Sequence, residues 1–362
     1  MIFSVPLSFI SDLRYDCTIV CFFHQYLTVQ KKGLAKGLVF FRCCDRIKCK
    51  QNDGSESMKT VAPDYYPAFR CKADKCEHTC CAGWEIDIDD DTYTYYKSIG
   101  GSMGEKLLGS ISDDDTPHFI LEGEDERCPM LDKNGLCALI TEFGEGALCQ
   151  ICADHPRFRN YYSDRIEIGL GLCCEAAGGL ILGNKDKVKL LTLADDGETE
   201  PLTEEERALF DLRSRMTGLL QDRRFPVHER MENVLALCHL KDTRSIKELA
   251  GIFLSLERLD ETWTQRLLKL AGTDGKTIDR TDECGQTILE QFAVCLVFRH
   301  TPYLKNPKAV LSISGMVRIF EALCAEEKRR SGETGLLLAV ETARLLSSEV
   351  EYSDENMERL FR

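Results

Sequence analysis

Ten cysteines lie between Cys71 and Cys174, and this concentration constrains the chain more than any other feature of the sequence. A Cys-x2-Cys pair lets two thiolates reach one ion from a tight turn, and each zinc or iron–sulfur centre takes about four protein ligands. These thiols therefore allow one or two metal centres with spare cysteines. The sequence predicts a metal-binding unit whose ligands are a subset of Cys71, Cys76, Cys80, Cys81, Cys128, Cys137, Cys149, Cys152, Cys173 and Cys174.

The kind of metal centre follows from which other ligands lie nearby. Only His78, His118 and His155 fall in the same region, so we expect all-cysteine ligation. So many thiols exceed the need of one structural zinc, which favours an iron–sulfur cluster such as 4Fe–4S, with zinc as the alternative. Adjacent cysteines diverge, so one member of Cys80-Cys81 and one of Cys173-Cys174 is expected to face a core or a second site.

Charge and hydropathy exclude several classes of partner. With 46 basic and 60 acidic residues the net charge is −14, which argues against binding of nucleic acid or anionic membranes. No window supplies the roughly 18 consecutive apolar residues of a membrane span. The N-terminus has no basic residues before its apolar run, so we expect no export signal and a cytoplasmic location. In that reducing compartment clustered cysteines are more often metal ligands or redox groups than members of disulfide bonds.

Composition and periodicity divide the chain into parts of a mainly α protein. Residues 1–57 are richer in basic than acidic side chains, and Met58-Lys59-Thr60 resembles an ordinary protein start. We interpret 1–57 as an atypical extension or a mis-called start. We expect a Cys-rich metal-binding unit over 58–185, a linker over 186–202 and a helical bundle or array over 203–362.

Helical spacing of apolar residues is clear in the last of these parts, whereas strand-like alternation is scarce throughout. Thr203 followed by three glutamates reads as an N-cap with an acidic first turn. Cys238, Cys295 and Cys324 lie on apolar helical faces and are interpreted as small buried hydrophobes. The sequence predicts helices over 203–220, 228–241, 244–259, 261–271, 284–300, 310–329, 333–348 and 354–361.

Several blocks together resemble a known family. They are DYYPAFRCKADKCEHTCCAGWEIDID (64–89), CPMLDKNGLCALI (128–140), LCQICADHPRFRNYY (148–162) and EIGLGLCCEAAGGLIL (167–182), followed by FAVCLVFRHTPYL (292–304) and SSEVEYSDEN (347–356). In order and spacing they resemble the flagellin lysine-N-methylase family, and more loosely the wider group of clustered-cysteine zinc- or iron-chelating proteins. The resemblance implies transfer of a methyl group from S-adenosylmethionine to lysine side chains of flagellin, the protein of the bacterial flagellum.

The residues themselves offer weak candidates for this chemistry. Asp154 or His155 is a candidate base, and Arg157 is a candidate partner for the carboxylate of the donor. The alternative is that these side chains orient metal ligands by hydrogen bonds. Replacing His155 by Ala and Asp154 by Asn separates the two interpretations, because only the second predicts loss of metal.

The donor site has no conventional signature. The run Glu167-Ile-Gly169-Leu-Gly171 superficially resembles a dinucleotide-type glycine loop, but we expect no strand before it and no βαβ repeat. The glycines are instead expected to permit close packing before Cys173-Cys174. The sequence also lacks a Cys-x3-Cys-x2-Cys triplet, which disfavours a radical mechanism. The alternative to an enzyme is a non-catalytic iron–sulfur or zinc protein acting in redox sensing or as a metal-stabilised adaptor.

Overall fold

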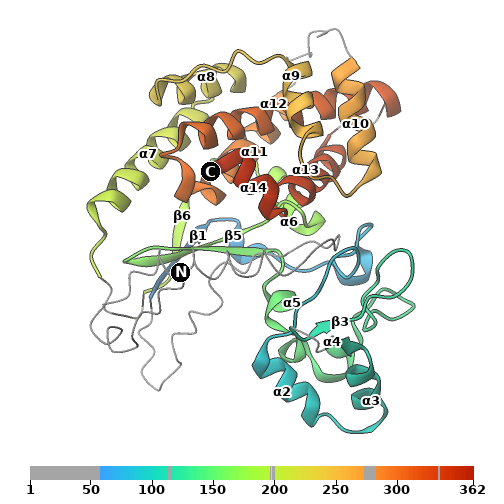
Figure 1. Cartoon of the computed structure of the whole chain (residues 1–362). Helices are drawn as coiled ribbons and strands as arrows, with labels where there is room; N and C mark the ends of the chain where they lie inside the picture. Colours follow the sequence, from blue (N-terminus) through green and yellow to red (C-terminus); the bar gives the residue numbers. More distant parts are fainter. Residues whose placement is uncertain (1–57, 113–115, 196, 198–199, 273–282, 333–334) are drawn as a thin grey trace, which may run out of the picture. The chain divides into compact units, whose positions relative to one another are not determined.

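The computed structural model describes residues 58–112, 116–195, 197, 200–272, 283–332 and 335–362, which form a mainly α protein (Figure 1). The predicted fold class, mainly α, is confirmed. The expected extension over 1–57 lies outside the described residues. Within the described residues no helix is both long and apolar enough to cross a lipid bilayer.

A run of amphipathic helices occupies the C-terminal part, and each helical stretch expected from residue 203 onward is a helix. Thr203 closes a capping box, because its hydroxyl accepts from the Glu206 amide and the Glu206 carboxylate accepts from the Thr203 amide. Ser245 and Glu248 repeat the arrangement. The helices are α7 (Glu204–Leu220), α8 (Val227–Leu237), α9 (Ile246–Leu254), α10 (Glu261–Gly272), α11 (Glu283–Arg299), α12 (Pro307–Ser331), α13 (Leu336–Val350) and α14 (Asp354–Phe361).

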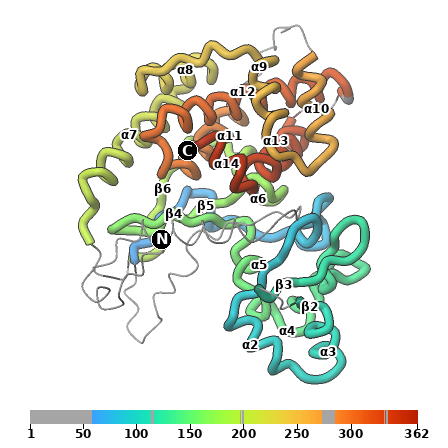
Figure 2. Tube along the Cα trace, viewed as in Figure 1, coloured from blue at the N-terminus to red at the C-terminus, as the bar shows by residue number. Residues whose placement is uncertain are grey.

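These helices share one hydrophobic core. Helix α11 is buried on nearly every side, and its Phe292 stacks on Phe320 of α12 with ring centroids 4.1 Å apart. Helix α6 (Glu175–Leu182) packs against α11 and α13, so the segment directly after Cys173-Cys174 belongs to this core. Figure 2 shows these helices as a tube along the Cα trace.

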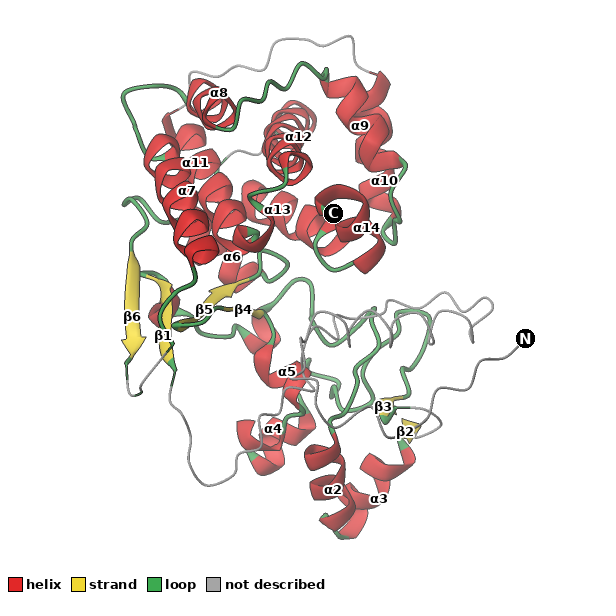
Figure 3. Ribbon diagram, turned by 60° about the vertical axis from the view of Figure 1, so that its left-hand side comes forward, coloured by secondary structure: helices red, strands yellow, loops and turns green. Residues whose placement is uncertain are grey.

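A small sheet was not expected from the sequence. Within the described residues, strands β1 (Lys59–Pro63), β4 (Arg157–Tyr161), β5 (Arg165–Leu170) and β6 (Leu190–Ala194) form one sheet in the order β4-β5-β1-β6 (Figure 3). Strands β1 and β5 are parallel, with Thr60 opposite Ile166, and the other pairings are antiparallel. The strands are five or six residues long, and β1 pairs with partners about a hundred residues away, so no local pattern indicates them. Strand β6 lies within the stretch expected to be a linker.

The cysteine-bearing segment consists of short elements around a second, smaller core. Its largest fully buried side chains include Tyr96, Phe119 and Met130, and the Tyr96 hydroxyl donates to the Ala147 carbonyl at 2.8 Å. Buried Cys128 and Cys149 belong to the same core. The elements are α2 (Asp90–Ser98), α3 (Gly101–Gly109), β2 (Ile111–Ser112), β3 (His118–Phe119), α4 (Ala138–Phe143), α5 (Gln150–Asp154) and the single 3-10 turns η2 (Tyr66–Ala68), η3 (Ala73–Lys75) and η4 (Glu145–Ala147).

Candidate functional site

Two groups of thiols gather in the cysteine-bearing segment. The first, which we call group A, contains Cys71, Cys76, Cys80 and Cys174. Burial, together with the nearby negative charges of Glu175, Cys174 and Cys71, raises the pKa of Cys76 to about 11. The hydrogen bond with the Cys81 thiol and then burial raise the pKa of Cys80, and the charges of Cys174 and Cys71 add a smaller effect. Group A therefore brings the loop that carries Cys71, Cys76 and Cys80 close to Cys174, which lies about a hundred residues later in the sequence.

Glu175, the first residue of α6, holds the two halves of group A together. One carboxylate oxygen accepts from the Lys72 ammonium at 2.7 Å, and the other accepts from the His78 amide at 2.6 Å. The His78 ring also lies 3.3 Å from a carboxylate oxygen of Glu341 on α13. These contacts fix the Cys71–Cys80 loop beside the N-terminus of α6, where Cys174 is the N-cap residue.

The second set, group B, contains Cys81, Cys128, Cys137, Cys149 and Cys152. The Cys128 amide donates to the Cys81 carbonyl at 2.8 Å, and the thiols of Cys149 and Cys152 hydrogen-bond to each other. Burial, together with the charges of Cys81, Cys137 and Cys149, raises the pKa of Cys128 to about 12. Group B thus sits inside the smaller core.

Group B contains two thiols that ionise more easily than an ordinary cysteine. A hydrogen bond from Cys80 lowers the pKa of Cys81 to about 7. A hydrogen bond from Cys152 lowers the pKa of Cys149. The thiolate is the form that binds metals, so these two side chains are prepared to act as ligands or nucleophiles.

The two pairs of adjacent cysteines differ from each other. The thiols of Cys80 and Cys81 hydrogen-bond to each other, so these two side chains do not diverge as expected. Cys174 belongs to group A, whereas Cys173 hydrogen-bonds to Tyr352. Burial raises the pKa of the Cys173 thiol to about 12. Cys173 is therefore the one clustered cysteine placed in neither group.

The donor set suits a thiophilic metal, although the side chains are not arranged around an ion. Within the described residues no three Cys, His, Asp or Glu side chains converge in a coordinating arrangement. Groups A and B nevertheless supply four and five soft donors, which is enough for one four-ligand centre each. Burial and then the neighbouring negative charges raise the pKa of Cys76 and of Cys128, and a bound cation would offset this cost by stabilising the thiolate forms. The residues fit such a group chemically.

The three candidate catalytic side chains lie around the junction of α5 and β4 but have different partners. Asp154 accepts from Arg159 at 2.7 Å and from Gln150 at 2.6 Å. Arg157 donates to the Tyr66 hydroxyl at 3.1 Å and to the Ala153 carbonyl at 3.2 Å. Both are therefore engaged locally.

His155 differs from its two neighbours. Its Nε2 atom is buried and has no hydrogen-bond partner, and its ring stacks on Trp84 at 6.3 Å. Burial, followed by the positive charges of Arg157 and Arg299, lowers the pKa of His155 to about 4. The ring is therefore neutral at physiological pH and a weak base.

A buried ionic network that sequence reasoning missed lies beside Cys173. Arg299, the last residue of α11, places its Nε 3.1 Å from Glu351, and His300 contacts the same carboxylate oxygen at 2.7 Å. Burial alone would raise the pKa of Glu351, but Arg299 and then His300 lower it to about 2. The sequence signal that could have indicated this network is the pair Arg299-His300, which follows a long apolar run.

The glycines of the 167–171 run are closely packed, but the expectation of no strand before this run was wrong. Strand β4 precedes it, and β5 contains Gly169 and ends just before Gly171. A Cβ atom on Gly169 would lie 2.3 Å from the Phe158 ring, and one on Gly171 would lie 2.4 Å from the Tyr352 hydroxyl oxygen. Gly169 lies within a strand rather than after one, and Glu167 is buried in an ion pair with Arg213. The run therefore serves close packing, as predicted.

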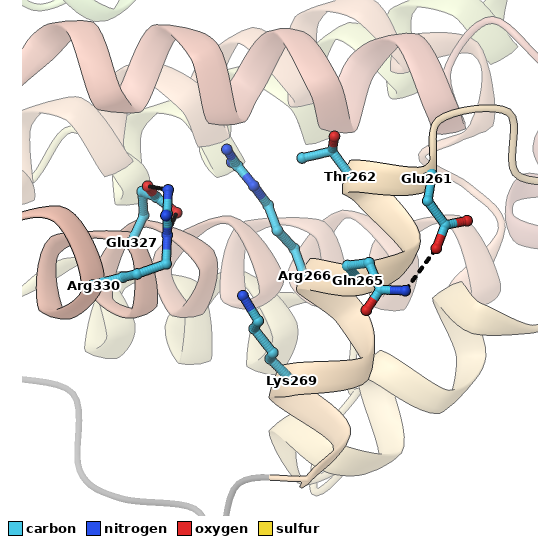
Figure 4. A pocket seen from close by; sticks show the side chains of 7 residues that line it. All are labelled: Glu261, Thr262, Gln265, Arg266, Lys269, Glu327 and Arg330. Atoms are coloured by element: carbon cyan, nitrogen blue, oxygen red, sulfur yellow. Dashed lines mark hydrogen bonds and ion pairs between the residues drawn. The ribbon is translucent and has the colours of Figure 1, made fainter.

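A hollow of about 310 Å³ lies between α10 and α12 (Figure 4). Basic and acidic side chains are mixed along it, and two of them, Arg330 and Glu327, are paired. Neither helix carries a group A or group B cysteine. The lining residues are Glu261, Thr262, Gln265, Arg266, Lys269, Glu327 and Arg330.

Curated proteins of Salmonella are similar to part of the chain. Two proteins named lysine-N-methylase, from Salmonella typhimurium and Salmonella choleraesuis, are each 25% identical over 148 residues. A protein named flagellar biosynthetic protein FliU, from Salmonella muenchen, is 25% identical over 141 residues. Each alignment covers 37% of this chain. The resemblance expected from the sequence is thus confirmed at this level of identity.

The extent of the match differs between the relatives. The alignments cover 35% of each lysine-N-methylase and 83% of FliU. The chain therefore spans about a third of the length of the two lysine-N-methylases. No protein-family profile matches the chain, and no solved structure does.

Proposed function

We propose that the protein is a protein-lysine N-methyltransferase that transfers a methyl group from S-adenosylmethionine to lysine side chains of flagellin, and that it carries cysteine-ligated metal. The observation that carries the proposal is the similarity to proteins named lysine-N-methylase and FliU. The gathered thiols and the buried polar residues beside them supply the site.

Groups A and B are the proposed ligand sets, and each is large enough for a separate centre. An iron–sulfur cluster is the proposed group, with zinc as the alternative. When bound, it would add positive charge that stabilises the loops and, as an iron–sulfur cluster, one-electron redox chemistry. The Cys71–Cys80 loop and Cys174 would hold one centre beside α6, and group B would stabilise the smaller core.

The remaining contribution of the chain is to position the substrate lysine and to remove water from around its amine. A lysine amine attacks only when it is deprotonated, and partial burial lowers the pKa of an amine. The acidic chain, with net charge −14, favours approach of a lysine-bearing surface. His155 is assigned to binding rather than proton abstraction, because its lowered pKa makes it a weak base.

Anaerobic purification followed by absorption spectroscopy and metal analysis tests the metal part of the proposal. An iron–sulfur protein shows visible absorption with iron and sulfide, and Cys174→Ser and Cys149→Ser should each remove part of it. Cys238→Ser is the matched control, since Cys238 lies outside both groups. A colourless protein with bound zinc selects the alternative metal, and a protein without either metal refutes cysteine ligation.

Methyl transfer is tested separately with donor that carries a labelled methyl group and with purified flagellin. The proposal predicts label on flagellin lysines with the wild-type protein and with Cys238→Ser, and its loss with Cys174→Ser. Bound metal without donor binding or methyl transfer would favour the non-catalytic reading, in which the protein senses redox state or acts as a metal-stabilised adaptor.

A further inference from the structure

Strand β6 lies at one edge of the four-stranded sheet (Figure 3). Within the described residues no strand pairs with its outer side, and most of its side chains are open to solvent. The exposed fractions of Leu190, Leu191 and Leu193 are 43, 40 and 41%, and Thr192 between them is exposed as well. An exposed apolar edge strand is a template for pairing with a further strand, and natural proteins protect such edges. Strand β6 carries neither a proline nor a charged side chain that would protect it.

The backbone of β6 presents hydrogen-bonding groups to this outer edge. The strand runs antiparallel to β1, and the regular register between them extends from Leu190 to Thr192. The Lys189 carbonyl accepts from the Asp64 amide at 2.8 Å, so the backbone of Lys189 faces the β1 side. Because backbone groups alternate in direction along a strand, those of Leu191 also face β1, whereas those of Leu190 and Thr192 face outward. These two residues are therefore positioned to pair with a further antiparallel strand.

Charged residues on either side of β6 indicate what kind of strand fits there. Exposed Lys187 and Lys189 precede the strand, and exposed Asp195 follows it. Asp195 lies 3.5 Å from Lys59 and still keeps 59% of its side chain exposed, so it can meet a second cation. When two copies of β6 pair in antiparallel, the basic end of each lies beside the acidic end of the other, and opposite charges across a strand pair are stabilising. The strand is thus complementary to itself, as a two-fold symmetric interface requires.

We propose that two copies of the chain associate through β6, with the two strands antiparallel about a two-fold axis at Leu191. In this register Leu190 of each copy pairs with Thr192 of the other, through the backbone groups that face the outer edge. The two Leu191 side chains lie opposite each other across the axis, so apolar surface that is exposed in the single chain becomes buried. The sheet then continues from one copy into the other. This interface is independent of methyl transfer, and none of the group A or group B cysteines lies in β6.

Light scattering and sedimentation of the full chain over a range of concentrations test this interface. We expect the mass of the wild type to rise with concentration from 41.0 kDa toward twice that value. Thr192→Pro removes an N–H that faces outward and leaves the hydrogen bonds to β1 in place, so this variant should stay monomeric. Thr192→Val is the matched control, because it keeps that N–H and should associate as the wild type does.

Inverting the charges beside β6 tests the symmetry of the pairing. K187E/K189E places acidic residues beside Asp195 of the other copy and should weaken association by about tenfold. Adding D195K makes the two ends opposite in charge again and should restore association, although the surface ion pair with Lys59 is lost. Because a third substitution cannot repair a general folding defect, this rescue identifies loss of the interface as the cause. The helical circular-dichroism signal checks the fold of every variant.

Hydrogen exchange of the Leu190 and Thr192 amides distinguishes a second copy from any other cover of this edge. The proposal predicts that their protection in the wild type grows with concentration. A wild type that is monomeric at every concentration would overturn the proposal, and protected amides in that monomer would show that another segment of the chain covers β6. A dimer that both T192P and K187E/K189E leave intact would place the contact on another surface and would equally overturn it. If T192P fails to fold, the charge variants decide the outcome.

Discussion

The ion pair between Glu167 and Arg213 gives the sharpest prediction about stability. Glu167 lies in β5 with no exposed surface, and Arg213 of α7 donates to both of its carboxylate oxygens, the Nη2–Oε1 distance being 2.8 Å. The guanidinium group also donates to the Thr301 hydroxyl at 3.3 Å. The pair therefore connects the sheet to two parts of the helical region.

Removing one partner leaves the other charge buried and uncompensated. Such a loss costs about 3–5 kcal/mol, whereas removing both charges costs much less than the sum of the two single changes. We expect E167Q and R213M each to lower the free energy of unfolding by about 3–5 kcal/mol. The E167Q/R213M double variant should reveal a coupling free energy of about 2–3 kcal/mol.

Urea unfolding followed by the helical circular-dichroism signal measures these values. The exposed pair Asp211–Arg215 on the same helix is the matched control, and its removal should change stability by less than about 1 kcal/mol. Single variants that cost less than about 1 kcal/mol, or costs that simply add, would refute the reasoning. Confirmation would also show that Glu167 is committed to Arg213 and is not a cofactor ligand.

Further predictions concern packing and pH. Gly169→Ala should destabilise the protein by about 1–3 kcal/mol in the same urea assay, because its Cβ would meet the Phe158 ring. Gly179→Ala, which has open space, should be neutral or stabilising; equal effects would contradict the packing argument. Burial raises the pKa of Glu349 to about 7 from 4.5. The folded state thus retains a proton that the unfolded chain releases, so the stabilisation is full below about pH 4.5 and is lost as pH rises through 7. Stability should fall by about 3 kcal/mol between pH 5 and pH 8, and Glu349→Gln should flatten this slope. An unchanged slope in the variant would assign the pH dependence to other groups.

The helices were predictable because their signals are local. The Thr203 cap, the acidic first turn and the apolar period lie within one segment, and α7 begins where they indicate. The sheet was not predictable in this way. Thr60 pairs with Ile166, and the residues around either position give no local signal of this distant partner.

The candidate site shows the same division. Cys71, Cys76 and Cys80 are close in sequence, so their gathering follows from spacing. The entry of Cys174 into group A depends on the Glu175 contacts with Lys72 and His78, which are tertiary.

Arg299 and Glu351 illustrate what a pattern of residue types leaves out. An arginine after an apolar run reads as the end of a helix, and only the fold places it beside a glutamate about fifty residues later. The Nη1 atom without a partner is a property of packing, and no spacing rule indicates it.

The central claim is lysine methylation, and mass spectrometry of flagellin co-expressed with the protein tests it most directly. The account predicts lysine-containing peptides heavier by one or more methylene groups with the wild-type chain and with Cys238→Ser, and unmodified peptides with Cys174→Ser. Unmodified flagellin lysines in the presence of the metal-loaded wild-type protein would contradict it.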